Sequence, residues 1–369
     1  MLTPEYLEQL PKTVVDLYTE AELLIIEDMA RRIRKAGGIT STAVWQLERA
    51  LAVEAVRGMV WRTLSQMTQI RQDVLRDLFR EACGDAVGGD NAAARAAGLN
   101  PVPLADNVEV QQVINNGLLR TNGTFDNLTR TTAATAAGQF EHALDLAHTQ
   151  VMSGAFDARS AIDHAIITLT TKGLKAIEYP SGHTDYLDVA VRRATLTGIS
   201  QAAGAAQLTN IGQLGAKHVE VSAHLGARTD ETHGITNHAW WQGRVYLLEG
   251  QNAEYANFYE ATGYGQGDGL CGWNCRHSFT AFWPEFSKRR YNDEELAKMR
   301  DAAVTYNGKK VGQYEAEQVQ RSLERQLRKA LREEAAGVGS HENVLAARKA
   351  LADFTRQTGL RRQTFREKA

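Results

Sequence analysis

Cysteine, proline and long apolar runs are all scarce in this sequence. Three cysteines among 369 residues are too few, and odd in number, for the disulfide framework of a secreted domain, so we expect folding in a reducing cytosol. Six prolines leave room for long uninterrupted helices. No segment approaches the roughly 18 consecutive apolar residues of a membrane span, and the N-terminus lacks the apolar stretch of a signal peptide. We therefore expect neither a membrane anchor nor a secreted scaffold.

An excess of charge of one sign is also missing. The 42 basic and 44 acidic side chains leave a net charge of −2, which gives no reason to expect nucleic-acid binding by the whole surface. The hydrophobic fraction of 43% is that of a globular protein, and the length exceeds what one core usually supports. We predict three regions: a helical arm over 1–105, an α+β core over 106–286 and a basic helical region over 287–369.

The apolar periodicity predicts a mainly α protein. A first helix is expected from the Thr3-Pro4 cap to Gly37-Gly38, and a second from about Thr40 to Cys83, long enough to pair as a hairpin. Residues 84–107 suggest a loop, a short helix and a hinge. Further helices are expected after Val108, broken near Asn122-Gly123, up to Gly173, and again up to about 215. His142, His148 and His164 stand singly in them and receive no role.

The periodicity changes to an alternating pattern after Val219. VEVSAH, RVYLL and HSFTAFW predict three short strands and hence a small antiparallel sheet, which preceding helices would cover. The stretch from Val219 to Pro284 also holds two of the three cysteines and four of the six tryptophans. We interpret it as the part of the chain where the fold depends most on particular residue types.

These residues resemble the phage minor capsid protein 2 family. The resemblance rests on VSAH with GAR, on HAWWQGRVY and on GLCGWNCRHSF, about 65 residues in all. The family is related in turn to the Mu F-type head morphogenesis proteins of tailed phages. The segment TDETHGITN separates the arginine from the histidine more widely than the family pattern leads one to expect. The motif residues to which we assign a structural role are Arg228, His238, Gly243, Asn274, Cys275 and Arg276.

The resemblance implies a structural, non-enzymatic role in a virion. Such proteins are similar to low-copy head components near the portal vertex that contact the portal or the major capsid protein and in some cases enter the host with the DNA. The N-terminal helices would be an assembly arm, and synthesis would take place in the cytoplasm of a bacterial host. The alternatives are a metal-dependent or toxin-like enzyme carried in the head and a DNA-binding ejection protein.

Cysteines and histidines of the motif could also bind a metal. Cys271, Cys275, His277 and His238 are the candidates for a zinc site. With one cysteine pair only, buried structural thiols in a tight turn are the preferred interpretation, in which Gly269 and Gly272 adopt positive φ. We therefore commit to no cofactor. Clustered carboxylates, a dinucleotide fingerprint and a nucleophile elbow are all missing, which argues against a nuclease, a transferase and a serine hydrolase.

The last region is basic. From Ser287 onward 19 basic and 12 acidic side chains give +7, which leaves −9 for the preceding residues. Amphipathic helices are expected there, with Asn292 and Ser340 as caps. Contact with packaged double-stranded DNA is one interpretation of this charge. A solvated helical hairpin that packs on the core is the other.

Overall fold

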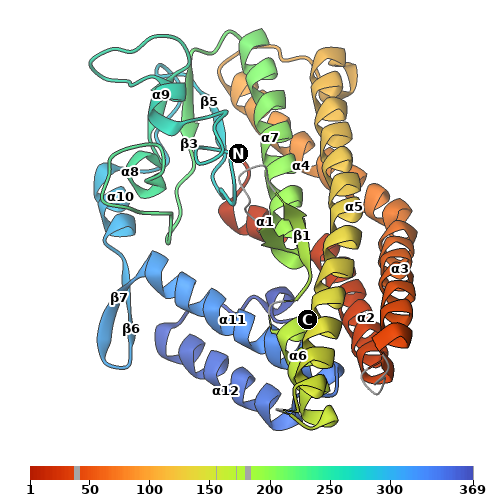
Figure 1. The fold of residues 1–369 in the computed structure, drawn as a ribbon. Helices are drawn as coiled ribbons and strands as arrows, with labels where there is room; N and C mark the ends of the chain where they lie inside the picture. The colour runs from red at the N-terminus through yellow and green to blue at the C-terminus, as the bar shows by residue number, and fades with distance from the viewer. Residues whose placement is uncertain (37–41, 155, 172, 179–183, 369) are drawn as a thin grey trace. The chain divides into compact units, whose positions relative to one another are not determined.

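The computed structural model describes residues 1–369 apart from 37–41, 155, 172, 179–183 and 369 (Figure 1). It is 66% helical with three small antiparallel sheets, which confirms the mainly α class with a small α+β part. The chain forms two compact units. Unit 1 comprises 1–11, 72–123 and 193–318, and unit 2 comprises 12–71, 124–192 and 319–369. Among the described residues, no helix is both long and apolar enough to cross a membrane.

The N-terminal helical region is divided more often than the sequence suggested. The predicted first helix is two helices, α1 (Pro4–Gln9) and α2 (Lys12–Ala36). Thr3 caps α1 as expected, since its hydroxyl accepts from the Tyr6 N–H. The interruption falls at Leu10 and Pro11, and Pro11 has no N–H to donate to a continuing helix. The predicted end at Gly37-Gly38 lies outside the described residues.

Two further helices replace the predicted second one. They are α3 (Thr42–Gln66) and α4 (Thr68–Ala96), and α3 packs on α2. The loop and hinge predicted for 84–107 were wrong over their first half, because α4 continues to Ala96. Asp90 explains this continuation. Its buried carboxylate accepts hydrogen bonds from Thr280, Ala281 and Gln207, so tertiary contacts outweigh the glycines nearby.

The middle of the chain is also more continuous than expected. After a single 3₁₀ turn, η1 (Leu104–Asp106), α5 runs from Val108 to Met152 without the break predicted at Asn122-Gly123. A glycine in a helix interior costs only about 1 kcal/mol relative to alanine, so packed neighbours can hold the helix together. Next come α6 (Ala158–Thr170), which Gly173 follows with φ +74, and α7 (Leu187–Gln213). The small β1 (Lys175–Glu178) and β2 (Thr184–Tyr186) pair was not predicted.

The predicted three-stranded sheet is present in unit 1. Its order is β4 (Val245–Leu247), β3 (His218–Val221) and β5 (Phe279–Phe282), all antiparallel. The register pairs Val219 with both Tyr246 and Ala281. All four residues of β5 are buried, so this strand is covered on both faces. The sheet core also contains Trp241, Phe258 and both motif cysteines.

The remaining described elements are helices and one hairpin, with irregular segments between several of them. α8 (His238–Trp241), α9 (Phe258–Thr262) and α10 (Asp293–Arg300) belong to unit 1. Asn292 caps α10 as predicted. The hairpin of β6 (Ala303–Tyr306) and β7 (Lys309–Gly312) was missed, although Asn307-Gly308 between them is a strong turn signal. α11 (Gln313–Ala335), α12 (His341–Thr358), which Ser340 caps as expected, and η2 (Thr364–Arg366) end the chain.

Candidate functional site

The site lies where α8 meets the irregular segment that precedes β5 in unit 1. The nine residues between Arg228 and His238 are organised by Asp230, whose carboxylate accepts from the Thr232 N–H and hydroxyl and from the Thr236 hydroxyl. These hydrogen bonds lower the pKa of Asp230. Asn237 closes the same loop by donating to the Asp230 and Thr232 carbonyls. The long insertion is therefore a compact turn that delivers His238 to the start of α8.

The segment from 263 to 277 folds by close backbone approach. A Cβ on Gly269 would lie 2.1 Å from the Gly263 carbonyl oxygen, and one on Gly272 would lie 2.2 Å from that of Gly267. The predicted positive φ at Gly269 and Gly272 was wrong, since in this described segment positive φ falls on Gly263 (φ 63), Gly265 (φ 91), Cys271 (φ 60) and Asn274 (φ 56). Both positions therefore require glycine because a Cβ would collide with a nearby carbonyl oxygen, and not because the backbone needs a positive φ there.

Three of the four candidate metal ligands come together where α8 meets this segment. His238, Cys275 and His277 each offer a nitrogen or sulfur atom, and these atoms lie within 4.8 Å of one another. The Cys275 Sγ lies 3.5 Å from the His277 Nδ1. Cys271 is buried nearby and is not one of the three, since its Sγ is directed to the His277 carbonyl oxygen at 3.9 Å. The cluster is therefore a buried N₂S group of side chains.

Burial sets the protonation of this cluster. It lowers the pKa of His238 to about 4 and lowers that of His277 well below its ordinary value. It also raises the pKa of the Cys275 thiol. In each case the water removed from the side chain had favoured its charged form. At neutral pH both imidazoles are uncharged, so each has one nitrogen with a free lone pair.

Arg228 and His238 are brought together by a shared neighbour. The His238 Nε2 donates to the Asp268 carbonyl at 2.8 Å, and the Arg228 guanidinium lies 3.6 Å from the Asp268 carboxylate. Arg228 also donates to the Trp273 carbonyl at 3.0 Å. The separation of these two motif residues in sequence thus does not keep them apart in space. Nothing in the sequence pointed to Asp268.

Arg276 links the motif to Glu8 of α1 and Glu317 at the start of α11, both in unit 1. Its guanidinium lies 3.3 Å from the Glu8 carboxylate and 2.9 Å from that of Glu317, and it donates to the Gly226 carbonyl. All three charged side chains are mostly buried, with exposed fractions of 16%, 4% and 17%. The residue therefore fixes the ends of α1 and α11 to the motif segment. Neither carboxylate was predicted from the sequence.

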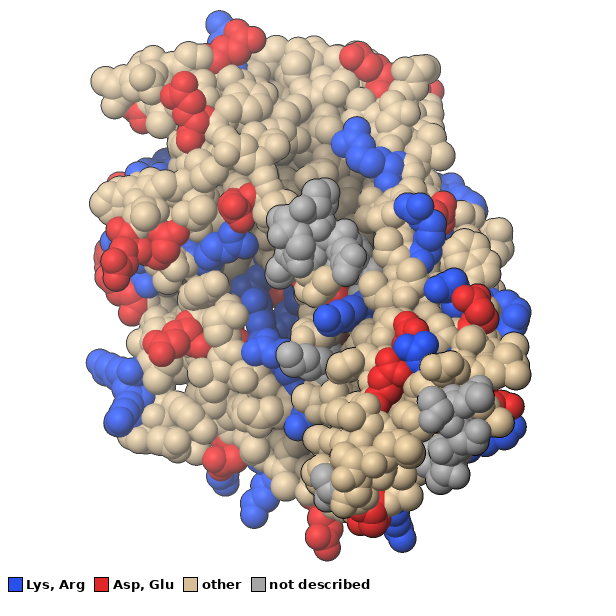
Figure 2. All heavy atoms as spheres, in the orientation of Figure 1, with Lys and Arg blue, Asp and Glu red and all other residues tan. Residues whose placement is uncertain are grey.

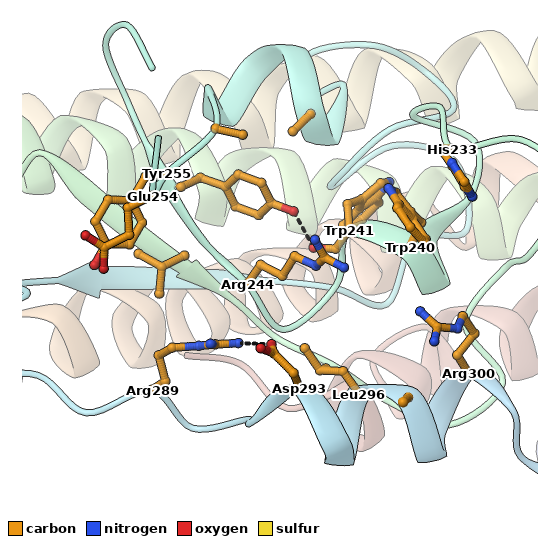
Figure 3. Close-up of a pocket in the computed structure, with 15 residues that line it drawn as sticks. His233, Trp240, Trp241, Arg244, Glu254, Tyr255, Arg289, Asp293, Leu296 and Arg300 are labelled. Carbon is orange, nitrogen blue, oxygen red and sulfur yellow. Dashed lines mark hydrogen bonds and ion pairs between the residues drawn. The ribbon is translucent and has the colours of Figure 1, made fainter. Parts of the chain in front are cut away.

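A cavity of about 620 Å³ opens beside α8 and α10 (Figure 3). Figure 3 shows Arg289 directed to Asp293, at an ion-pair distance of 2.9 Å. The Trp240 ring is covered by His233, stacked at 3.8 Å between centroids, and by the Arg244 guanidinium at 5.3 Å. The aromatic surface is thus already in contact with side chains of this chain. The adjacent tryptophans of HAWW were the one sequence signal for this cavity, which we did not predict.

Together the fold and the site define a mainly helical protein in which the motif side chains hold an irregular segment in place. A family model described as phage minor capsid protein 2 matches residues 2–362. The chain belongs to this phage minor capsid protein family, and the match covers nearly all of it, not only the motif stretch. No curated protein and no solved structure matches the chain.

Proposed function

We propose that this protein is a low-copy structural component of a tailed-phage head that acts at the portal vertex by contacting the portal or the major capsid protein. The observation that carries the proposal is the family match, which covers residues 2–362 and so includes the helices outside the motif. Membership in a minor capsid family supports a virion protein with other virion proteins as partners. On this proposal the protein acts through interfaces and not through turnover.

An exposed apolar face of α3 supports a protein partner. Val44, Leu47, Leu51 and Trp61 are 48% to 63% exposed. Their spacing of three, four and ten residues puts them in one sector of the helix. The opposite side of α3 is buried and also apolar, so the helix has apolar residues on both sides, although its exposed side also carries charged residues such as Glu54 and Arg62. We assign this face to a contact with another virion protein.

Contact with packaged DNA is the second proposal, and the +7 charge after residue 286 favours it. Part of this charge is already neutralised inside unit 2, where Arg328 pairs with Asp188 and Lys368 with Asp16, each at 2.9 Å or less. On the face drawn in Figure 2, basic and acidic side chains of the described residues are interspersed. A filter-binding series in rising salt tests this contact, with a slope of about −0.9 per phosphate neutralised.

The primary test uses purified capsids. We expect the protein in low copy per particle, with crosslinks from α3 to the portal or the major capsid protein. Leu47→Asp with Leu51→Asp should reduce incorporation without lowering thermal stability, because both side chains are exposed. Leu345→Asp on α12 is the matched control, since Leu345 is 50% exposed and lies outside the apolar face of α3. Absence of the wild type from capsids would refute the function, and normal incorporation of the double variant would refute the role of α3.

A further inference from the structure

The cluster of His238, Cys275 and His277 has the composition and spacing of a zinc site. Zinc bonds of about 2.3 Å to sulfur and 2.0–2.1 Å to nitrogen, at tetrahedral angles, separate an S and an N ligand by about 3.6 Å. The Cys275 Sγ and the His277 Nδ1 are 3.5 Å apart. A ring nitrogen of His238 lies within 4.8 Å of the ligand atoms of Cys275 and His277, so the three side chains are close enough to share one ion after a small adjustment. Imidazole nitrogen and cysteine thiolate are both ligands that zinc accepts, and three protein ligands with a water in the fourth position is the pattern of an open zinc site.

The hydrogen bonds behind His277 orient its lone pair toward Cys275. The Gln242 Oε1 accepts the His224 backbone N–H at 3.0 Å, which fixes the orientation of this amide because a backbone N–H can only donate. The same oxygen lies 3.0 Å from the His277 Nε2, so that nitrogen must carry the ring proton. The His277 Nδ1 is then the nitrogen with the lone pair, and it is the one that faces the Cys275 sulfur.

His238 is held in the corresponding way. Its Nε2 lies 2.8 Å from the Asp268 carbonyl oxygen, which can only accept, so Nε2 carries the proton and the other ring nitrogen has the lone pair. Metal-binding histidines commonly donate their second ring nitrogen to a carbonyl or carboxylate, which fixes ring orientation. Both histidines of the cluster are thus prepared as neutral ligands. A hydrogen bond from the Cys275 thiol to His277 would satisfy that pair alone and would leave the lone pair of His238 unused.

We propose that His238, Cys275 and His277 bind one Zn²⁺, with a water molecule as the fourth ligand. A zinc–sulfur bond forms as the Cys275 thiol releases its proton to solvent, and both histidines bind without a change in protonation. The ion would tie α8 to the segment before β5, which regular secondary structure does not hold. This inference does not depend on the capsid partner.

The test is metal analysis of the full-length protein. After incubation with equimolar Zn²⁺ and desalting, we expect one zinc per chain for the wild type and for Cys83→Ser, since Cys83 is a free cysteine that lies outside the cluster, in the core around α4. Cys275→Ser should lose the zinc. Substitution with Co²⁺ should give a tetrahedral spectrum with a thiolate charge-transfer band, which decides the question from the wild type if the Cys275 variant does not fold. No retained zinc, or equal retention by Cys275→Ser, would overturn the proposal.

Gln242 allows a test that keeps all three ligands. Gln242→Leu removes the acceptor for His277 and should weaken zinc binding about 10- to 100-fold. Gln139→Leu is the control, because the Gln139 side chain also bonds backbone groups, those of Gly173 and Lys175, and belongs to unit 2. Competition with a chromophoric chelator measures both affinities, and circular dichroism checks folding. Equal affinities for two folded variants would show that Gln242 does not position a zinc ligand.

Discussion

Gly243, one of the motif residues, offers the sharpest test of the packing around the site. It has φ +69, and a Cβ at this position would lie 2.3 Å from the Leu296 Cδ2 and 3.1 Å from the Ala223 Cβ. Gly243→Ala should therefore be destabilising for two separable reasons. One is the left-handed backbone, and the other is the collision with Leu296 of α10.

The two contributions have different sizes and different controls. An alanine in the left-handed region costs about 1 kcal/mol or somewhat more. Overpacking adds about 1–3 kcal/mol, and we take about 2 because the Leu296 side chain borders the cavity and can move. The expected total is about 3 kcal/mol. Gly250→Ala isolates the backbone contribution, since Gly250 has φ +68 and an added Cβ there would meet nothing within 4 Å, and it should cost about 1 kcal/mol.

A double-mutant cycle measures the collision directly. Leu296→Ala alone should cost about 2 kcal/mol, because the side chain is 7% exposed. In its presence Gly243→Ala should cost only the backbone part, so the two changes together should be about 2 kcal/mol less harmful than their sum. Urea unfolding followed by tryptophan fluorescence is a suitable assay, since four of the six tryptophans lie in unit 1. Additive effects, or equal costs at Gly243 and Gly250, would refute the reasoning.

Two further predictions concern buried charges. Arg276→Met should destabilise the protein by about 3 kcal/mol because it removes a buried cation that pairs with the Glu8 and Glu317 carboxylates. Arg76→Met, in an ion pair that is half exposed, should change stability by less than about 0.5 kcal/mol, and equal urea midpoints for the two variants would contradict this. Burial raises the pKa of Glu324 from 4.5 to about 7, so the folded state holds a proton that the unfolded state releases in that interval. Wild type should therefore lose about 3 kcal/mol relative to Glu324→Gln as the pH rises from 4.5 to above 7, and a difference independent of pH would refute the shift.

Local signals in the sequence were reliable where one residue determines the backbone. The caps at Thr3, Asn292 and Ser340 are confirmed because each side chain accepts a hydrogen bond from an N–H of its own first turn. The strands of the sheet were found because period-two alternation has no helical equivalent. The Asn307-Gly308 turn carried a signal of the same strength, and it would have sufficed to predict β6 and β7.

Glycines inside helices misled the prediction, since their effect depends on tertiary contacts. Glycines in α4 and Gly123 in α5 suggested breaks, yet both helices continue. Asp90 anchors α4 through partners at 207, 280 and 281, which are more than a hundred residues away in sequence. A cost of about 1 kcal/mol per glycine is smaller than such contacts contribute. No window of local sequence contains that information.

The site was predicted in its residue types and only partly in its geometry. The motif gave His238, Cys275 and His277, and the structure brings their ligand atoms together. Gln242 and Asp268, which orient the two histidines, act through an amide oxygen and a backbone carbonyl. Such roles depend on which backbone and side-chain groups the fold brings next to the histidines, so residue type alone does not reveal them.

Three of the motif side chains share one structural role, which is to donate a hydrogen bond to a backbone carbonyl. Arg228 donates to the Trp273 carbonyl, His238 to the Asp268 carbonyl and Arg276 to the Gly226 carbonyl. Backbone N–H and C=O groups that are buried outside helices and sheets must find hydrogen-bond partners. An irregular segment does not form the regular backbone hydrogen bonds that would supply them. Long, multiply donating side chains can reach those carbonyls from neighbouring segments. The family motif is therefore best understood as the set of donors that allows a glycine-rich segment to be buried against the sheet.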